Sequence, residues 1–276
     1  MEIRDKDSYG IARVLIEQSD SNYNYILWCT DTRECAVIDP CDARTILEIV
    51  QRLGLRVKYI INTHTHPDHI EGNDAILKVS LQSFDSSSAA KILVHPSRKQ
   101  HVAPRNEPID EGDVVEVGAL NIRVIHTPGH CPEHISLILD DCIFVGDTIF
   151  SAGCGNVRFR GDVDALYDTF ANRLTPLPDN LIIHYGHEYT EKNLRFALDI
   201  EPSNKAVASK LVVVRAALSK GEYVPLPTLG EEKTYNPFLR VEVPEVIEAV
   251  KRKVPEAGHG PRNVFKALRG LRDEWV

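Results

Sequence analysis

The chain has 276 residues, of which 43% are hydrophobic and 26% are charged, a balance typical of a globular protein that folds around its own core. Its formal net charge of −8 disfavours nucleic acid as a partner, because an acidic surface repels phosphates. We find no apolar run long enough to span a bilayer, no signal peptide after Met1 and no C-x-x-C pair among the six cysteines, so we expect a cytoplasmic protein with reduced thiols rather than a membrane, secreted or mitochondrial one.

The first two-thirds of the chain alternates segments typical of strands with segments typical of helices. Short apolar runs bounded by turn residues indicate the strands, and apolar residues spaced three and four apart indicate the helices. In chain order the expected elements are strands 25–29 and 35–39, helix 43–53, strand 57–61, helix 72–80, strand 92–95, a hairpin over 112–125, and strands 135–139, 142–145 and 181–184. Alternation of this kind predicts an α/β fold.

The character of the sequence changes after residue 187, where helical spacing replaces the strand patterns. Helices are expected at 193–200, 205–218, 244–253 and 263–275, with a proline-rich connector over 224–228. We therefore predict two domains, a β-rich α/β domain over 1–187 and a smaller all-helical domain over 188–276.

The segment Thr63-His64-Thr65-His66-Pro67-Asp68-His69 carries four side chains that can bind a metal, directly after the expected strand 57–61. The end of a strand is where α/β folds commonly place their sites. His64 and His66 are two apart, so on an extended backbone they point the same way, while Asp68 and His69 follow where the chain turns. One loop could thus supply two metal ions; the alternative is a surface loop that is merely rich in histidine.

Three later strands also run into potential ligands. His130 follows strand 120–125, Asp147 follows strand 142–145, and His187 follows strand 181–184. Taken singly, Asp147 is explained equally well as a helix cap, and the nearby His126 and His184 are better explained as strand-end or core histidines.

Counted together, the candidates make two sets. One metal could take His64, His66 and His130, and a second could take Asp68, His69 and His187. The two carboxylate oxygens of Asp147 could bridge them. Each ion would then keep a position open for water, as a catalytic site requires.

With these residues in place, the chain resembles the metallo-β-lactamase superfamily, and most of all its glyoxalase II branch, the hydroxyacylglutathione hydrolases. The matching pieces span most of the chain: Thr63 to His69, His126-Thr127-Pro128-Gly129-His130, Gly146-Asp147-Thr148-Ile149-Phe150, Gly153-Cys154-Gly155, Gly186-His187-Glu188-Tyr189-Thr190, Glu231-Glu232-Lys233 and Asn236-Pro237-Phe238-Leu239-Arg240. The first piece indicates only the superfamily, whereas the piece from Gly186 to Thr190 and the piece from Asn236 to Arg240 favour the thioester hydrolase branch.

The resemblance implies a metallo-β-lactamase-type αββα sandwich as the catalytic domain, with the helical domain binding substrate. It also implies two divalent metal ions on the seven ligands counted above, and this ligand set accepts zinc, iron or manganese. The implied reaction is hydrolysis of S-2-hydroxyacylglutathione thioesters, such as S-D-lactoylglutathione, by a hydroxide that the metals share, in methylglyoxal detoxification. Asp68 would also orient that hydroxide, and we expect a monomer whose partner is this small substrate.

Six residues are expected to bind the substrate: Tyr189, Arg158, Phe159, Arg160, Arg269 and Arg272. By resemblance, Tyr189 matches a tyrosine that contacts the substrate, and Arg269 and Arg272 match basic positions that hold the glutathione part. Cations suit that role because glutathione carries carboxylates.

The chain departs from the family's pattern in two places. Asn156-Val157-Arg158-Phe159-Arg160 stands where the family has a basic residue and shortly afterwards an aromatic one, and it has one extra residue. Arg158 or Arg160 would supply the cation there and Phe159 the aromatic ring. Cys131-Pro132-Glu133-His134 stands where the family usually has Thr-x-Gly-His.

Other activities on the same fold stay open. A mononuclear-iron persulfide dioxygenase would not need the complete second set of Asp68, His69 and His187, and a thioesterase could use another thiol carrier such as trypanothione. A two-metal nuclease is disfavoured by the acidic balance, and a non-catalytic relative by the presence of every ligand. Asp39, which ends strand 35–39, is a candidate partner for a ligand histidine, or a plain turn residue.

Overall fold

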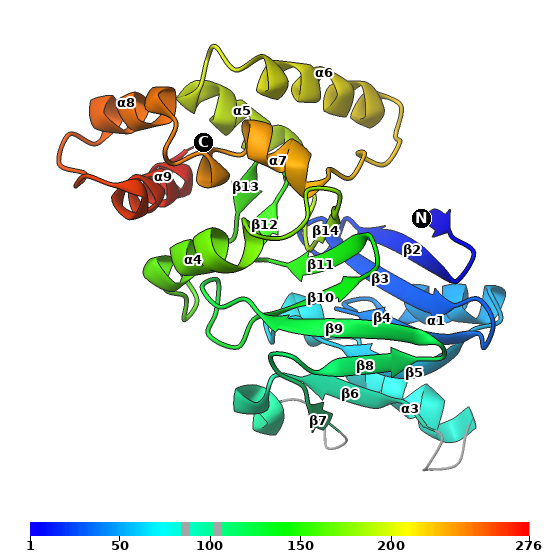
Figure 1. Cartoon of the computed structure of the whole chain (residues 1–276). Helices are drawn as coiled ribbons and strands as arrows, with labels where there is room; N and C mark the ends of the chain where they lie inside the picture. The colour runs from blue at the N-terminus through cyan, green and yellow to red at the C-terminus, as the bar shows by residue number, and fades with distance from the viewer. Residues whose placement is uncertain (84–88, 102–105, 276) are drawn as a thin grey trace.

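The computed structural model describes residues 1–83, 89–101 and 106–275, which form two main sheets flanked by helices (Figure 1). The larger sheet has the strand order β1-β2-β3-β4-β5-β6-β7, and the smaller has the order β14-β11-β10-β9-β8. A short third sheet pairs β12 with β13. None of the helices in these described ranges is both long and apolar enough to cross a bilayer.

The strands are β1 (Glu2–Asp5), β2 (Tyr9–Ile16), β3 (Asn22–Cys29), β4 (Glu34–Ile38), β5 (Arg56–Ile61), β6 (Lys91–Val94), β7 (Asn106–Pro108), β8 (Val114–Val117), β9 (Leu120–His126), β10 (Ile135–Leu139), β11 (Cys142–Gly146), β12 (Ile149–Phe150), β13 (Gly153–Cys154) and β14 (Ile182–Tyr185). The helices are α1 (Ala43–Arg52), α2 (Pro67–Ile70), α3 (Asn73–Ser83), η1 (Pro96–His101), α4 (Val163–Thr169), η2 (Phe170–Leu174), α5 (Thr190–Ile200), α6 (Lys205–Ser219), α7 (Leu229–Tyr235), η3 (Pro237–Leu239), α8 (Pro244–Lys253) and α9 (Pro261–Glu274). Every strand and helix predicted from the sequence is present, with ends shifted by a few residues.

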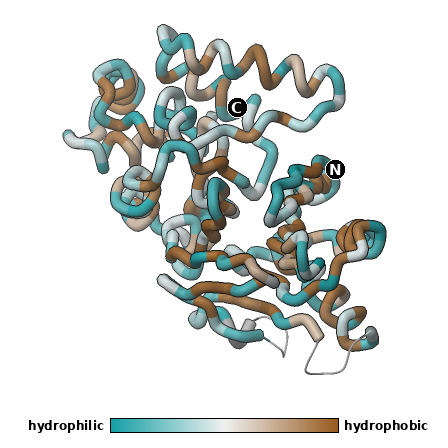
Figure 2. Tube along the Cα trace, turned by 45° about the vertical axis from the view of Figure 1, so that its right-hand side comes forward, coloured by the Kyte–Doolittle hydropathy of each residue, from teal (hydrophilic) through white to brown (hydrophobic). Residues whose placement is uncertain are grey.

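The core lies on both faces of the seven-stranded sheet. Along β3, Tyr25 and Leu27 join the apolar residues of the five-stranded sheet, whereas Ile26 and Trp28 join those of α1 and α3, because side chains alternate between the faces of a strand. Hydrophobic residues follow the strands through the interior (Figure 2). The predicted sandwich with a helical C-terminal region is confirmed.

Strand β2 is an addition to the predicted elements, and one residue explains why its pattern is hard to recognise. Arg13 stands among the apolar residues of β2 and is 2% exposed. Its guanidinium lies 4.9 Å from the ring centre of Tyr23 and 5.1 Å from that of Tyr223, and it donates a hydrogen bond to the carbonyl of Val224. A buried cation with these partners is stable, but it interrupts the alternation that indicates a strand.

Helix α7 is also an addition, although the sequence carries its start signal. Thr228 accepts a hydrogen bond from the backbone N–H of Glu231, and the Glu231 carboxylate accepts one from the N–H of Thr228. This reciprocal capping box stabilises the first turn of a helix only seven residues long. Helix α5, in turn, begins at Thr190, earlier than the predicted start at 193.

The strand directions bring several chain segments to one edge of the sandwich. β9 and β11 both pair antiparallel with β10, and β11 pairs parallel with β14, so the C-terminal ends of β9, β11 and β14 lie at the same edge. The loop after β5 reaches that edge as well, because the carbonyl of Thr63 accepts a hydrogen bond from the N–H of Ile135. Residues that follow these four strands therefore meet.

Candidate metal centre

The loop after β5 is shaped by the short helix α2. His66 is the last residue before that helix and keeps an extended backbone, with φ −70° and ψ 148°. Pro67 then begins α2, where its fixed φ favours the first helical turn. His64 and His66 consequently lie on extended chain, while Asp68 and His69 turn away on the helix toward a second point.

Three histidines direct ring nitrogens toward one place, which is the first of two candidate metal positions. The Nδ1 atom of His66 lies 3.1 Å from Nε2 of His64 and 2.9 Å from Nε2 of His130. One Nδ1–H could donate to only one of those nitrogens. A cation among the three would accept all their lone pairs, so these donor atoms fit a metal ion.

Two histidines and a carboxylate converge at the second point. The Nε2 atoms of His69 and His187 are 3.3 Å apart, and an Asp68 oxygen lies 3.2 Å from that of His187 and 3.6 Å from that of His69. His69 is fully buried and His187 nearly so. This set also has the spacing of a metal site.

Asp147 lies between the two sets. One carboxylate oxygen is 3.6 Å from Nε2 of His130 and 3.5 Å from that of His187, and the other is 3.5 Å from Nε2 of His69. A side chain at Gly186 would displace the Asp147 carboxylate, since an added Cβ would lie 2.2 Å from one of its oxygens. Within the described residues, the Oδ1 atom of Asp147 is buried without a hydrogen-bond partner, as expected for an oxygen meant for a cation.

The outward nitrogens of the histidines are held by the surrounding chain. The Nδ1–H of His130 donates to the carbonyl of Asn156 at 2.7 Å, and that of His187 donates to the carbonyl of Asp20 at 2.9 Å. Each bond leaves the lone pair of Nε2 facing the other candidate ligands. Asp39, the candidate partner from the sequence, lies 3.0 Å from Nδ1 of His69.

His64 and Asp147 have the protonation states that metal binding requires, whereas His187 does not. Burial lowers the pKa of His64 well below its usual range, and the neighbouring His69 lowers it further, so this ring is neutral. Burial alone would raise the pKa of Asp147, but His187, His69 and His130 hold it well below its usual range. A neutral imidazole and an ionised carboxylate are the forms that bind metals. Burial would lower the pKa of His187, but Asp147 and Asp68 raise it well above its usual range, so a metal would have to displace a proton from this ring.

Four of the six predicted substrate residues surround a cavity of about 210 Å³ beside this centre: Tyr189, Arg158, Arg269 and Arg272. The Tyr189 ring stacks on that of His187, with centroids 5.1 Å apart. Arg272 donates to the side chain of Asn193, and Arg158 to the carbonyl of Asp273. Lys192 lines the same cavity, and no sequence signal distinguishes this lysine from its surface neighbours.

Arg269 differs from the other cations in being 5% exposed. Its guanidinium donates to the carbonyls of Cys154 and Gly155 and to the carboxylate of Asp273. Arg269 therefore supports the wall of the cavity and is less free than Arg272 to meet a substrate. The sequence shows that residue 269 is a cation, but it does not show which hydrogen-bond acceptors inside the protein this cation has.

The other two predicted substrate residues lie elsewhere. Phe159 is 64% exposed, and its ring centre is 6.0 Å from that of His66. Arg160 pairs with Glu133 and does not line the cavity around Arg272.

His134 is a residue of the centre that the sequence reasoning passed over. Its Nε2 atom accepts a hydrogen bond from the backbone N–H of Asp147 at 3.1 Å, and its ring stacks on that of His64. Its Nδ1 atom lies 3.0 Å from the hydroxyls of Thr127 and Thr148. A histidine directly before the apolar run of β10 was the available signal, but position alone does not separate it from a core histidine.

A second group of metal-ligating side chains lies at the edge of the molecule, formed by His95, Asp110 and His126. All three are partly exposed. Nε2 of His95 is 3.4 Å from Asp110, and the Nε2–H of His126 donates to the carbonyl of Pro132. We call these three residues the rim cluster, and the seven predicted ligands the central cluster.

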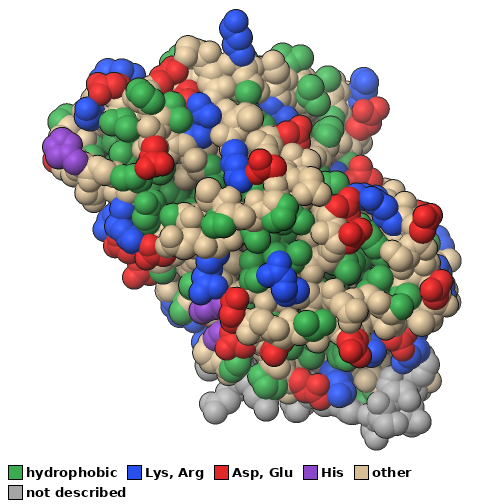
Figure 3. Space-filling view, in the orientation of Figure 1, with side chains coloured by type: hydrophobic (Ala, Val, Ile, Leu, Met, Phe, Trp, Pro, Cys, Tyr) green, Lys and Arg blue, Asp and Glu red, His purple; other side chains and the backbone are tan. Residues whose placement is uncertain are grey.

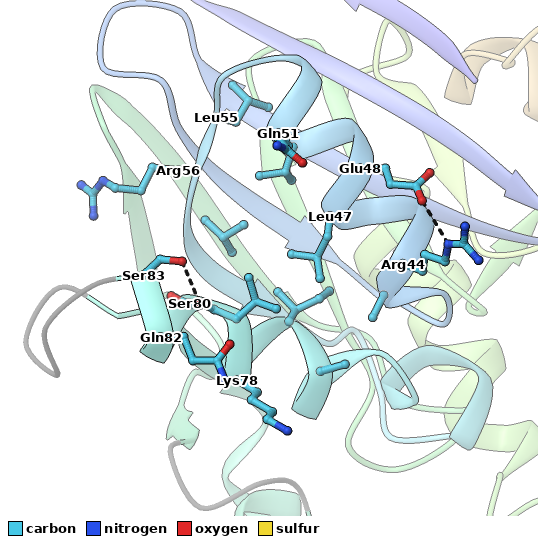
Figure 4. A pocket seen from close by; sticks show the side chains of 16 residues that line it. Arg44, Leu47, Glu48, Gln51, Leu55, Arg56, Lys78, Ser80, Gln82 and Ser83 are labelled. Atoms are coloured by element: carbon cyan, nitrogen blue, oxygen red, sulfur yellow. Dashed lines mark hydrogen bonds and ion pairs between the residues drawn. The ribbon is translucent and has the colours of Figure 1, made fainter.

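A cavity of about 840 Å³ lies away from both clusters, between α1 and α3 (Figure 4). Leu47, Leu55 and Ile76 give it apolar walls, and none of its sixteen lining residues belongs to either cluster. Because none of the candidate ligands lines this cavity, we do not assign the reaction to it, despite its volume. On the face seen in Figure 3, acidic and basic side chains are interspersed, which is unlike a nucleic-acid surface.

Residues 20–187 match the family described as metallo-beta-lactamase superfamily, and residues 188–275 match the hydroxyacylglutathione hydrolase C-terminus. A hydroxyacylglutathione hydrolase from Polaromonas sp. is 35% identical, with 96% of this chain and 99% of the relative aligned. One from Nitrosococcus oceani is 37% identical over 92% and 95%, and a cytoplasmic one from Arabidopsis thaliana is 32% identical over 92% and 95%.

Solved structures share the fold. The crystal structure of ETHE1 from Myxococcus xanthus has a TM-score of 0.64 at 23% identity, with 96% of this chain and 99% of that chain covered. TTHA1623, solved in a di-iron-bound form, has a TM-score of 0.54 at 22% identity, with 83% and 100% covered. At these identities the likeness concerns the architecture only.

Proposed function

The chain belongs to the hydroxyacylglutathione hydrolases of the metallo-beta-lactamase superfamily, and on that premise we propose how its own residues perform the hydrolysis. The reaction cleaves a hydroxyacylglutathione thioester into glutathione and a 2-hydroxy acid. The observation that carries the proposal is the convergence of the central cluster on two points joined by Asp147.

In our assignment His64, His66 and His130 would hold one divalent ion and Asp68, His69 and His187 would hold the other, with the Asp147 carboxylate within reach of both sets. The donor set of imidazoles and carboxylates suits zinc, iron or manganese. Metal ions bound there would supply a Lewis acid for the thioester carbonyl and lower the pKa of the attacking water.

Asp68 has a second role in this proposal. Its side chain is 36% exposed, whereas the side chain of Asp147 is 10% exposed, so Asp68 can also meet a water at the mouth of the centre. A hydrogen bond from that water to the carboxylate would orient it toward the carbonyl carbon. The leaving group is a thiolate, which is stable enough to depart without a dedicated acid.

The glutathione part is assigned to the cavity beside Tyr189. Arg272, Arg158 and Lys192 would pair with its carboxylates, while Arg269 keeps the cavity wall in shape. Arg272 is the central cation of this set, because its only hydrogen-bond acceptor among the described residues is the neutral Asn193. Phe159 would lie on the acyl side, next to His66.

The organisation of the chain is part of the same proposal. Residues 1–187 would form the catalytic domain and residues 188–276 the substrate-binding domain, with both contributing to a site on one monomer. We propose a cytoplasmic location, as for the named relative from Arabidopsis thaliana.

The test is an assay of thiol release from S-D-lactoylglutathione by metal-free protein reconstituted with zinc, iron or manganese. We expect turnover only after reconstitution. The matched assay uses the same acyl group on trypanothione, and faster turnover there would change the assigned carrier. Oxygen consumption with glutathione persulfide and no thioester turnover would replace hydrolysis by persulfide oxidation.

A further inference from the structure

Glu133 is a fully buried carboxylate beside the metal centre that is neither a metal ligand nor a residue of the glutathione cavity. It follows the candidate ligand His130 by three residues. Three side chains surround it. The hydroxyl of Thr65 donates to it at 2.8 Å, and Arg160 donates to both of its oxygens at 2.6 and 3.2 Å. Nε of Arg98, whose N–H donates to Thr65, lies 3.4 Å away.

These contacts tie together segments that are distant in the sequence. Thr65 stands between the candidate ligands His64 and His66, so Glu133 touches the metal loop itself. Arg160 belongs to the 156–160 loop, which also carries Phe159. Glu133 and Arg160 lie in the two stretches where the sequence departs from the family's pattern, and the structure joins them in one ion pair.

The partners keep this carboxylate charged. Burial alone would raise the pKa of Glu133, but the hydrogen bonds from Arg160 and Thr65 lower it to about 2. A buried charge that loses such a partner must find another or draw in water. The bidentate geometry with Arg160 also restricts the direction of the loop, because both parallel bonds form in only one orientation.

We infer that Glu133 is a positioning residue, which clamps the 156–160 loop to the metal loop through Arg160 and Thr65 and so holds Phe159 as the wall of the acyl site. This inference rests on the proposed function. Phe159 is 64% exposed and its ring meets the His66 ring at 79°, so the contacts of Phe159 alone do not hold it there. The clamp determines which acyl groups fit, while the metal ligands themselves stay in place.

The test uses Glu133→Gln, Arg160→Gln and the double variant, each assayed with S-D-lactoylglutathione and with the bulkier S-D-mandeloylglutathione. We expect wild-type metal content, a loss of about tenfold in kcat/KM for the lactoyl substrate that appears mainly in KM, and a smaller loss for the mandeloyl substrate. Because the two residues act through one contact, the double variant should lose no more than either single variant. Phe159→Ala should reproduce the altered ratio of the two substrates.

The matched control is Arg173→Gln. The Arg173 side chain is 41% exposed and pairs with Glu111, and that of Arg160 is 43% exposed and pairs with Glu133, so both substitutions remove a half-exposed arginine from one ion pair. The acids differ, because Glu133 is buried whereas the side chain of Glu111 is 51% exposed. The control should keep wild-type kinetics with both substrates. Arg160→Gln also keeps the test decisive should Glu133→Gln fail to fold.

Three results would overturn the clamp. The first is an equal loss with both substrates, and the second is additive losses in the double variant. The third is loss of metal from Arg160→Gln, which would make the pair a support of the metal loop instead of the acyl wall. Failure of the wild-type protein to hydrolyse either thioester is a separate outcome and would reject the proposed function.

Discussion

The central cluster and the rim cluster contain the same residue types but differ in what surrounds them. In the central cluster, His64, His69, His130 and His187 are at most 3% exposed and point nitrogens at one another. In the rim cluster, all three residues are partly exposed, and the Asp110 side chain is 50% exposed. Close spacing of ligand atoms and a carbonyl partner for one ring nitrogen are common to both clusters, so burial is what distinguishes the candidate metal centre.

The sharpest way to break this comparison is to remove one histidine from each cluster. His66→Ala should lose bound metal and thioester hydrolysis, both by more than the roughly 10–100-fold that loss of an outer partner costs. His126→Ala, its matched control, should keep wild-type metal content and turnover. Metal analysis and thiol release on the same samples measure both. Equal losses in the two variants would mean that the clusters do not differ.

The Asp39→Asn substitution tests the partner of the candidate ligand His69 and leaves the ligand itself unchanged. Asp39 has a positive φ of 50°, which asparagine also tolerates, so the backbone should persist. Loss of the charge beside His69 should weaken metal binding by about 10–100-fold, as measured by competition with a chelator. Asp110→Asn in the rim cluster should leave the affinity unchanged, and an unchanged affinity in Asp39→Asn would remove Asp39 from the account.

A buried acid with no cationic partner among the described residues extends the comparison to stability. Burial raises the pKa of Glu232 from its ordinary 4.5 to about 7, although the N–H of Ala152 and the Asn236 side chain donate to it. A folded-state pKa above the unfolded value means that the folded chain binds more protons in this window. Stability should therefore fall as pH rises from about 4.5 to about 7, by up to about 3 kcal/mol from this group.

Glu232→Gln removes that titration and keeps the hydrogen-bond acceptor. Denaturant unfolding of both proteins at acid and neutral pH should show that the free energy of unfolding of the variant increases relative to that of the wild type as pH rises. Both proteins contain the same histidines, so the contribution of histidine titration cancels when their free energies of unfolding are subtracted. The same pH dependence of the free energy of unfolding in both proteins would contradict the raised pKa of Glu232.

The smallest expected effect concerns the cavity for glutathione. Arg272→Gln should raise KM for S-D-lactoylglutathione by about tenfold, the equivalent of about 1.4 kcal/mol, with little change in kcat. Added salt should raise the wild-type KM more than that of the variant, because the lost contact is between charges. A wild-type KM in Arg272→Gln would move the glutathione part away from this cavity.

The sequence predicted the parts of the molecule that depend on local pattern. The strand over 57–61, the turn at Pro67 and the spacing of His64 and His66 are read from adjacent residues, and all lie as expected. The burial of Arg13 in β2 was not predictable in the same way, because Tyr223 and the carbonyl of Val224, which contact it, are distant in the chain.

The same distinction applies to the candidate site. Arg269 could be predicted as a cation near the substrate, but not as one whose guanidinium is occupied by the carbonyls of Cys154 and Gly155. The pairing of Arg160 with Glu133 joins two irregular loops, for which no periodicity exists to interpret. Contacts of this kind are determined by the packing of the whole chain and appear only in the structure.

The most direct test of the central claim is a metal titration of the metal-free protein in which thiol release from S-D-lactoylglutathione is followed as metal is added. The account predicts that hydrolysis rises until both points of the central cluster are filled, at two ions per chain, and that oxygen is not consumed. Saturation at one iron per chain, with oxygen uptake on glutathione persulfide in place of thiol release, would contradict it.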